Sequence, residues 1–225
     1  KKFECQIERI HGVGVDENRF FPVLEDEKKE LRSQMGYNEN QKLILCVGEL
    51  LPNKNQQMAI RMMTEVTKQY PDAKLLLAGN GPEKNNLDNL IAKLGLQDNV
   101  ELLGYVTNLQ DYQHIVDVCV ACSKREGLPL NIVEAMLSGT PVVATYNRGH
   151  RELIQDGKNG YLVCSSDEMH KKVVDLLSDS EKKNEICEVA GIFAKAYGFD
   201  NVKRELEKVY GKVFTKRPQR NLSIS

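Results

Sequence analysis

Short, continuous runs of apolar residues recur along this chain and limit its fold more than any other feature. The runs cover residues 43–47, 74–78, 100–103, 118–122 and 142–145, and only the polar residues Lys74, Glu101 and Thr145 depart from the apolar pattern. An uninterrupted apolar run of this length is typical of a strand that is buried on both faces of a parallel sheet. Helical patterns lie between the runs, such as the stripe of Met58, Met62 and Val66. We therefore expect an α/β fold, a Rossmann-like parallel sheet with helices on both faces.

The balance of charge excludes one class of partner. The 225 residues include 31 Lys and Arg against 32 Asp and Glu, a net charge of −1. A nucleic-acid-binding domain normally has a basic excess, so we expect no nucleic-acid partner. No apolar run approaches the roughly 20 residues that span a bilayer, and there is no secretory signal. The chain opens on Lys1 rather than methionine, which suggests a fragment or a processed chain.

Six cysteines are present, most of them in apolar, strand-like runs, where cysteine behaves as a small hydrophobe. Cys119 and Cys122 form a C-x-x-C motif, but residues three apart in a strand point to opposite faces. No second motif or nearby histidine completes a zinc set. We expect structural cysteines, no metal site, and a reducing, cytoplasmic compartment.

The segment from residue 123 to residue 145 indicates an anion site. A helix is expected to begin at Pro129, because proline suits the first helical turn, and to end at Gly139. Leu128 before it is a poor N-cap, so the first N–H groups of the helix lack a side-chain partner. Gly127 lets a backbone approach an anion closely. The sequence therefore predicts a phosphate site at the start of this helix.

Glu126 and Glu134 flank this helix start and are separated by seven residues, with Gly-Leu-Pro after the first. This pattern resembles the donor-sugar motif of the retaining glycosyltransferases of family 4, which have the GT-B fold. The resemblance implies that Glu126 contacts the donor sugar and Glu134 the nucleotide ribose. It also implies donor-binding roles for Gly127, Leu128, Pro129 and Leu130. Alternatively, Glu126 complements a helix dipole and Glu134 is a solvated surface residue.

A second motif begins at Gly48, directly after the first apolar run, where α/β sheets bind ligands. Family members carry a Gly-Arg pair here with a lysine five residues after the arginine, and both cations hold the diphosphate. Lys54 matches and is implied to be catalytic together with the first glutamate of the pair, but Glu49 occupies the arginine position. Lys124 or Arg125 could supply the missing cation. The alternative for Lys54 is a solvated lysine at a helix start.

Three further segments follow expected strands. Residues 79–82 (GNGP) lack the third glycine of a dinucleotide fingerprint, so NAD binding is not expected, and we interpret them as a structural turn. Tyr105 and Val106 correspond to where family members seat the nucleotide base, although Tyr105 could instead belong to the core. His150 and Arg151 could contact the donor, but a helix start explains them equally well.

The resemblance extends from residue 11 to about residue 210 and implies a domain organisation. Residues 1–22 are expected to be the end of a preceding domain and the interdomain linker. Residues 23–198 form the nucleotide-sugar-binding Rossmann-like domain, and residues 199–225 a C-terminal helix and basic tail. The apolar residues expected to face inward on that helix are Val202, Leu206, Val209 and Phe214.

The function implied is that of the C-terminal, donor-binding domain of a retaining family 4 glycosyltransferase. The enzyme would move a sugar from a nucleotide donor, expected to be UDP-linked, to a saccharide or lipid-linked acceptor, as in surface polysaccharide synthesis. No cofactor or divalent metal is expected, because a lysine and a helix N-terminus can offset the charge of the departing diphosphate.

The acceptor would bind through a preceding domain, so this chain alone is expected to be inactive. The full-length enzyme could associate with the inner face of the membrane. Two alternatives remain: a sugar-nucleotide epimerase of the same fold, and a non-catalytic scaffold derived from it.

Overall fold

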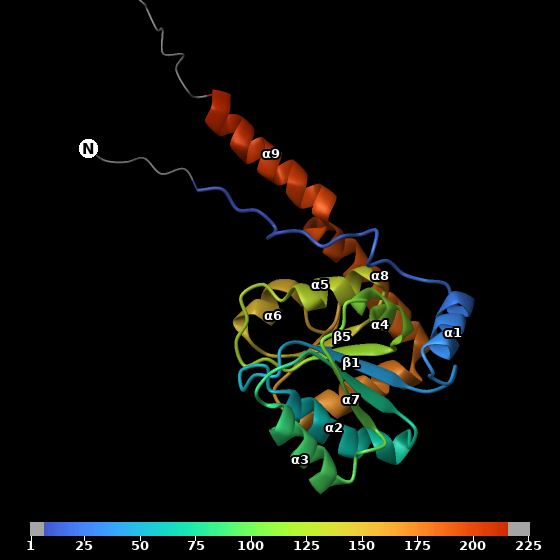
Figure 1. Ribbon diagram of the computed structural model, residues 1–225. Coiled ribbons are helices and arrows are strands. Elements are labelled where there is room, and N and C mark those ends of the chain that lie inside the picture. The colour runs from blue at the N-terminus through green and yellow to red at the C-terminus, as the bar shows by residue number, and fades with distance from the viewer. Residues whose placement is uncertain (1–6, 216–225) are drawn as a thin grey trace, which may run out of the picture.

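A computed structural model of the chain describes residues 7–215, with side chains for residues 7–212. Six strands form one parallel sheet in the order β3-β2-β1-β4-β5-β6 (Figure 1). The strands are β1 (Leu43–Val47), β2 (Lys74–Ala78), β3 (Val100–Gly104), β4 (Val118–Ala121), β5 (Val142–Thr145) and β6 (Tyr161–Val163). All five apolar runs are strands, which confirms the expected Rossmann-like α/β fold.

Helices cover both faces of the sheet (Figure 1). One face packs against α2 (Gln56–Gln69), α3 (Lys84–Leu94) and α7 (Ser166–Ser178). The other packs against α4 (Leu109–Ile115), α5 (Leu130–Leu137) and α8 (Ser180–Ala194), with α1 (Glu25–Gln34) beside α4. The remaining helices are α6 (Arg148–Leu153), the 3-10 turn η1 (Lys195–Tyr197) and α9 (Phe199–Thr215).

Alternate residues of one strand contribute to different cores, which explains why the central strand β1 is apolar throughout. On β1, Ile44 and Cys46 belong to the α2/α7 core, whereas Leu43 and Leu45 belong to the α5/α8 core. All four are buried. A polar residue at any of them would lose its hydration without gaining a partner.

The two residues of the C-x-x-C motif follow the same alternation. Cys119 lies in the α5/α8 core and Cys122 in the α2/α7 core, as expected for opposite faces of a strand. Both thiols are buried: burial raises the pKa of Cys119 above the ordinary value of 9.0, and the contact with Cys46, followed by burial, raises the pKa of Cys122. The two cysteines are packed as small apolar side chains.

Helix α5 starts one residue later than the sequence predicts. Pro129 is its N-cap, with an extended ψ of 93°, and the helical residues begin at Leu130. The helix ends as expected, because Gly139 adopts a left-handed φ of 71° that glycine reaches without strain. Ile132 and Met136 of this helix face the core.

A buried ionic cluster holds α1 against the N-terminal ends of the central strands β1 and β4. The motifs lie at the opposite ends of these strands. Asp117 accepts the backbone N–H of Leu43 at 2.9 Å and pairs with Lys28 at 3.2 Å and Arg32 at 2.9 Å. Lys28 and Arg32 also donate to the carbonyls of Val116 and Ile115. Nearly every polar atom of the cluster therefore has a partner, as burial requires.

The segment around Val15 meets the segment between α8 and α9 beside the sheet. The N–H of Val15 donates to the carbonyl of Tyr197 at 3.0 Å, and the N–H of Phe199 donates to the carbonyl of Val15 at 2.8 Å. From there α9 projects away from the sheet, and the N-terminal segment crosses its first turns (Figure 1). His11 joins the two through Glu205, whose Oε1 lies 2.7 Å from its Nδ1.

The inward face expected for α9 is confirmed in part. Val202 is buried, whereas Leu206 and Val209 are half-buried. The side chain of Phe214 lies outside the described residues, as do residues 1–6 of the segment expected to end the preceding domain and the basic tail.

Candidate active site

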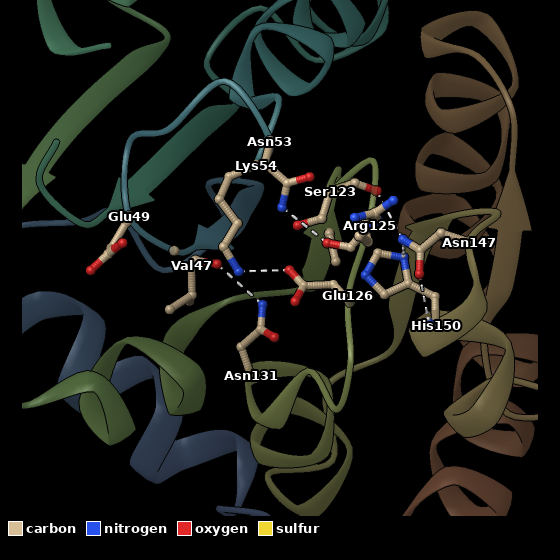
Figure 2. Close-up of polar contacts among 12 residues, drawn as sticks. Val47, Glu49, Asn53, Lys54, Ser123, Arg125, Glu126, Asn131, Asn147 and His150 are labelled. Atoms are coloured by element: carbon tan, nitrogen blue, oxygen red, sulfur yellow. Dashed lines mark hydrogen bonds and ion pairs between the residues drawn. The ribbon is translucent and has the colours of Figure 1, made fainter. Parts of the chain in front are cut away.

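An ion pair joins the two residues that the sequence analysis implied to be catalytic. The Nζ atom of Lys54 lies 2.6 Å from Oε1 of Glu126 (Figure 2). Lys54 comes from the loop after β1, and Glu126 from the loop between β4 and α5. β1 and β4 are neighbours at the point where the strand order reverses, which is the usual ligand site of an open α/β sheet.

The environment of Glu126 keeps it ionised. Burial alone would raise the pKa of its carboxyl, but the hydrogen bonds from Lys54 and Ser123 outweigh burial and lower the pKa below the ordinary 4.5. Lys54 is therefore no solvated surface lysine, and Glu126 has a specific partner rather than only a helix dipole. Both side chains keep some exposure to solvent, 29% for the lysine and 15% for the glutamate, so a ligand can reach the pair.

Asn53 and Asn55 tie the two loops together. Asn53 donates its side-chain amide to the carbonyl of Arg125 at 3.0 Å and accepts the N–H of Lys124 at 2.8 Å through its own carbonyl. Asn55 donates to the carbonyl of Cys122 at 3.3 Å. The sequence analysis overlooked both asparagines, because their partners lie about 70 residues away and form no local pattern.

Lys124 and Arg125, considered as replacements for the missing cation, are both exposed, and their backbones rather than their charges contact Asn53. The structure pairs neither charge with an acid in the described part of the chain. The carboxylate of Glu49 points away from the Lys54–Glu126 pair (Figure 2). The acid at the expected arginine position therefore does not oppose the ion pair directly.

A polar cluster behind the loop fixes its path. Thr145 and Asn147 both donate to the carbonyl of Ser123, at 2.6 and 2.8 Å, and Asn147 caps α6 by accepting the N–H of His150 at 3.0 Å. The ring Nδ1 of His150 lies 2.7 Å from the carbonyl of Thr145, so this nitrogen donates. His150 is buried and its pKa is lowered by that burial. His150 therefore supports the helix start and the loop.

Gly149 brings α6 into contact with the loop. A Cβ atom there would lie 2.7 Å from the Cβ and carbonyl oxygen of Glu126 and 2.7 Å from the carbonyl oxygen of Gly127. Any larger residue would push the Glu126 loop outward. The glycine thus sets the position of Glu126 across the fold, which the sequence analysis did not detect.

The start of α5 presents uncapped backbone N–H groups beside the ion pair. No side chain caps the helix, as the sequence predicts, so the helix start offers backbone N–H groups without a side-chain partner to an anion. Asn131 donates its side-chain amide to the carbonyl of Val47 at 3.1 Å (Figure 2). This contact holds the helix start at the end of β1.

Glu134 lies one turn further along α5 and is half-buried. Burial raises the pKa of its carboxyl above the ordinary 4.5, against a smaller opposing effect of Arg19. Glu134 is therefore less solvated than the alternative interpretation assumes, and its contact with the ribose stays a prediction. A partly buried carboxylate that lacks a strong cationic partner is suited to accept hydroxyl hydrogen bonds from a ligand.

Two cavities lie next to the ion pair, one lined by Gly48, which lies beside the Lys54 side chain, and the other by Glu126. The first, here the Tyr105 cavity, has a volume of about 370 Å³ and is lined by residues that include Gly48, Tyr105 and Val106. Tyr105 is 77% exposed, so it does not belong to the core. The second, here the α6 cavity, has a volume of about 560 Å³ and is lined in part by Glu126, by Gly127 and Leu128, and by residues of α6.

Arg151 does not line either cavity. Its guanidinium stacks on the ring of Tyr146 at 4.9 Å and donates to the tyrosine hydroxyl at 3.0 Å. Within residues 7–215, no group of three His, Cys, Asp or Glu side chains has a metal-binding arrangement. No helix there has the length and apolarity to cross a membrane.

Comparison with known proteins decides the family. Residues 27–191 match the family described as "Glycosyl transferases group 1". The chain belongs to this family. Among curated relatives of this group 1 domain, a putative glycosyltransferase EpsD of Bacillus subtilis (strain 168) is 38% identical over 160 residues, 71% of this chain and 42% of that protein. The chain spans about half the length of the curated relatives it matches.

Solved structures of GT-B glycosyltransferases share the fold of this group 1 domain. Anabaena HepE in complex with UDP superposes with a TM-score of 0.80 at 25% identity, over 88% of this chain and 56% of that one. The C-terminal domain of LpcC, a group 1 protein of Francisella tularensis, has a TM-score of 0.70 at 26% identity, over 81% of this chain and 97% of that one.

Proposed function

We propose that this group 1 domain is the donor-binding half of a retaining family 4 glycosyltransferase that uses a UDP-sugar. The observation that carries the proposal is the Lys54–Glu126 ion pair beside the uncapped start of α5, with one cavity lined by Glu126 and another lined by Gly48 beside Lys54. In a nucleotide sugar the charged diphosphate lies between the nucleoside at one end and the sugar at the other. This arrangement matches an ion pair and a helix start that lie next to two cavities. Anabaena HepE, a structural neighbour, has been solved with UDP and with UDP-glucose.

The base would occupy the Tyr105 cavity and the ribose would lie against Glu134. The diphosphate would meet the first N–H groups of α5 and the ammonium of Lys54, and Glu126 would face the sugar, beside the α6 cavity. Gly48 at the end of β1 and residues 127–130 would supply backbone close to the phosphates. Arg125 would approach the same charge from the loop edge.

Sugar transfer breaks the bond between the anomeric carbon and the diphosphate oxygen, so negative charge develops on that oxygen. Fixed N–H dipoles and a lysine placed there stabilise this charge more in the transition state than in the bound donor, which lowers the barrier. Lys54 would supply the cationic part, and α5 the dipolar part. Glu126 would hold the sugar in place for attack by the acceptor hydroxyl. No residue in this scheme needs a metal or cofactor.

The acceptor half would come from chain outside residues 23–198. We assign residues 1–22 to the linker from that half and residues 199–225 to the C-terminal helix and tail. The acceptor would be a saccharide or a lipid-linked saccharide, as in polysaccharide synthesis, and a lipid-linked acceptor would place the whole enzyme at the membrane surface. The cytoplasmic location expected from the cysteines stays a prediction.

Calorimetric titration of the chain with UDP, GDP, uridine and UDP-glucose tests the proposal. We expect UDP to bind, uridine to bind more weakly, and binding to persist in chelator but to weaken with salt, because the diphosphate contact is electrostatic. Failure of every nucleotide to bind would favour a non-catalytic scaffold. An epimerised free sugar nucleotide in place of a glycosylated acceptor, formed by the full-length enzyme, would favour the epimerase.

A further inference from the structure

The α6 cavity is larger and more highly charged than the contacts of Glu126 with a neutral sugar would require. Its volume is about 560 Å³, and five basic or acidic side chains line it beside Tyr197: Arg9, His11, Glu126, Arg148 and Glu152. Their pairing decides which charge the cavity presents to a ligand.

Four of these side chains have partners. Glu126 pairs with Lys54 at 2.6 Å, Arg9 with Glu152 at 3.1 Å, and His11 with Glu205 at 2.7 Å. Each acid in the cavity wall is therefore matched to a basic group. The pairs leave the cavity without an unmatched negative charge.

Arg148, the first residue of α6, is the exception. It is exposed, and in the described part of the chain its side chain makes no hydrogen bond or ion pair. The nearby Arg151 differs, because its guanidinium is occupied by Tyr146. The cavity beside Glu126 thus presents one guanidinium whose charge no described residue balances.

We infer that the sugar held in the α6 cavity carries an anionic group, a carboxylate or a phosphate ester, that pairs with Arg148. This inference rests on the proposed function, since it concerns the sugar beside Glu126. A guanidinium binds a carboxylate or phosphate through two parallel hydrogen bonds, which a hydroxyl group cannot match in charge. The anionic group belongs either to the transferred sugar or to the acceptor, and the two sources give different binding patterns.

Two titrations of the chain separate these sources. In the first, UDP-glucuronate is compared with UDP-glucose; in the second, glucuronate and glucose 6-phosphate are compared with glucose, in the presence of UDP. An anionic ligand should bind about fivefold more tightly than its neutral counterpart, the upper range for an ion pair that is open to solvent. A preference in the first titration assigns the anion to the donor, and a preference in the second alone assigns it to the acceptor.

Variants test whether Arg148 causes the preference. Arg148→Gln should abolish it and leave UDP affinity unchanged, whereas the matched control Arg151→Gln should retain it. Glu152→Gln should increase it, because Arg9 then loses its acidic partner and adds a second free cation to the cavity. Both arginines are exposed, so neither substitution should prevent folding.

Equal binding of anionic and neutral ligands in both titrations would overturn the inference, as would a preference that survives Arg148→Gln. If UDP binds normally in those cases, the proposed donor function stands and only the anionic sugar is wrong. If UDP itself does not bind, the proposed function fails, and the comparison of glucuronate with glucose without nucleotide still tests the cavity.

Discussion

Lys54 and Glu126, 72 positions apart in the chain, meet with their charged atoms 2.6 Å from each other. Each is also a candidate contact for the donor, the lysine for the diphosphate and the glutamate for the sugar. Without a ligand the two charges offset each other. A donor must therefore share the lysine with the glutamate, and this competition makes the effects of mutating the two residues unequal.

Replacing Lys54 with methionine should weaken UDP binding about tenfold, because a charge-assisted hydrogen bond to the diphosphate is lost. Uridine, which has no phosphate, should bind as before. The pKa of Glu126 should rise, since Lys54 is a main cause of its lowering. Calorimetry with both ligands, and NMR titration of the carboxyl, would measure this. Equal loss of uridine and UDP binding would contradict the phosphate role of the lysine.

The same variant carries a pH signature. A carboxyl with a lowered pKa in the folded state stabilises the fold above its ordinary pKa of 4.5, and this contribution is lost as the pH falls through the lowered value. Lys54→Met should therefore lose stability relative to the wild type at pH 7, and the difference should shrink towards pH 3. Urea unfolding at the two pH values would show it.

Replacing Glu126 with alanine should leave UDP affinity unchanged or slightly increased, because Lys54 is then free for the diphosphate. Binding of the intact UDP-sugar should decrease, since the sugar loses its carboxylate contact. The difference between the affinities for UDP and for UDP-glucose is the quantity to compare with the wild type. A loss of uridine affinity as large as that in Glu134→Ala would mean that Glu126 only shapes the loop.

Replacing Glu134 with alanine or glutamine should weaken UDP and UDP-sugar alike, by roughly ten- to a hundredfold, if its carboxylate accepts two ribose hydroxyls. Without ligand, Glu134→Gln should be more stable than the wild type at neutral pH. The raised pKa of Glu134 means that wild-type stability falls as the pH rises from about 4.5 through the folded pKa. The glutamine variant should lack this fall in thermal unfolding.

Replacing Gly149 with alanine should displace the Glu126 loop, because the added Cβ would overlap with Glu126 and Gly127. We expect a loss of about 1–3 kcal/mol in the free energy of unfolding, typical of overpacking, and weaker UDP-sugar binding. Gly191→Ala is the matched control, because its Cβ would lie 3.8 Å from the carbonyl oxygen of Met136, an ordinary van der Waals contact. In helix α8, that change should stabilise by about 0.5–1 kcal/mol. Unchanged donor affinity in the first variant would argue against the role of Gly149.

Replacing Asp117 with asparagine should destabilise the fold by about 3–5 kcal/mol, because it leaves Lys28 and Arg32 buried without their counter-ion. The hydrogen bond from the N–H of Leu43 can persist, so the change removes the negative charge of the side chain but keeps this contact. UDP affinity of the folded protein should not change, since the cluster lies away from the motifs. Urea unfolding and calorimetry measure the two effects, and a loss of UDP affinity without a loss of stability would contradict this assignment.

The strands of the sheet could be predicted from the sequence, because a strand that is buried on both faces requires mainly apolar side chains. All five residues of β1 are apolar. The sequence also located Lys54, Glu126 and Glu134, since they occupy motifs at strand and helix ends. The start of α5 was misplaced by one residue because proline suits both the N-cap and the first helical position, and only the backbone angle of Pro129 separates the two.

Contacts between distant loops could not be predicted in the same way. Asn53 and Gly149 contact the Glu126 loop from distant parts of the chain. Their neighbours in the sequence do not indicate these contacts. The charge balance of the α6 cavity could not be predicted either, for the same reason. Arg148 differs from Arg151 only in what surrounds it, and the surroundings come from segments far apart in the chain.

The hydrogen bonds that join Val15 to Tyr197 and Phe199 have a consequence for protein engineering. They bring the two ends of the folded body side by side, so a short peptide could join them and new termini could be opened elsewhere. The turn at Gly157, where an added side chain would meet nothing within 4 Å, is a suitable place for such a cut. A circular permutant opened there would keep every strand intact and would carry both loops of the site on one uninterrupted stretch of chain.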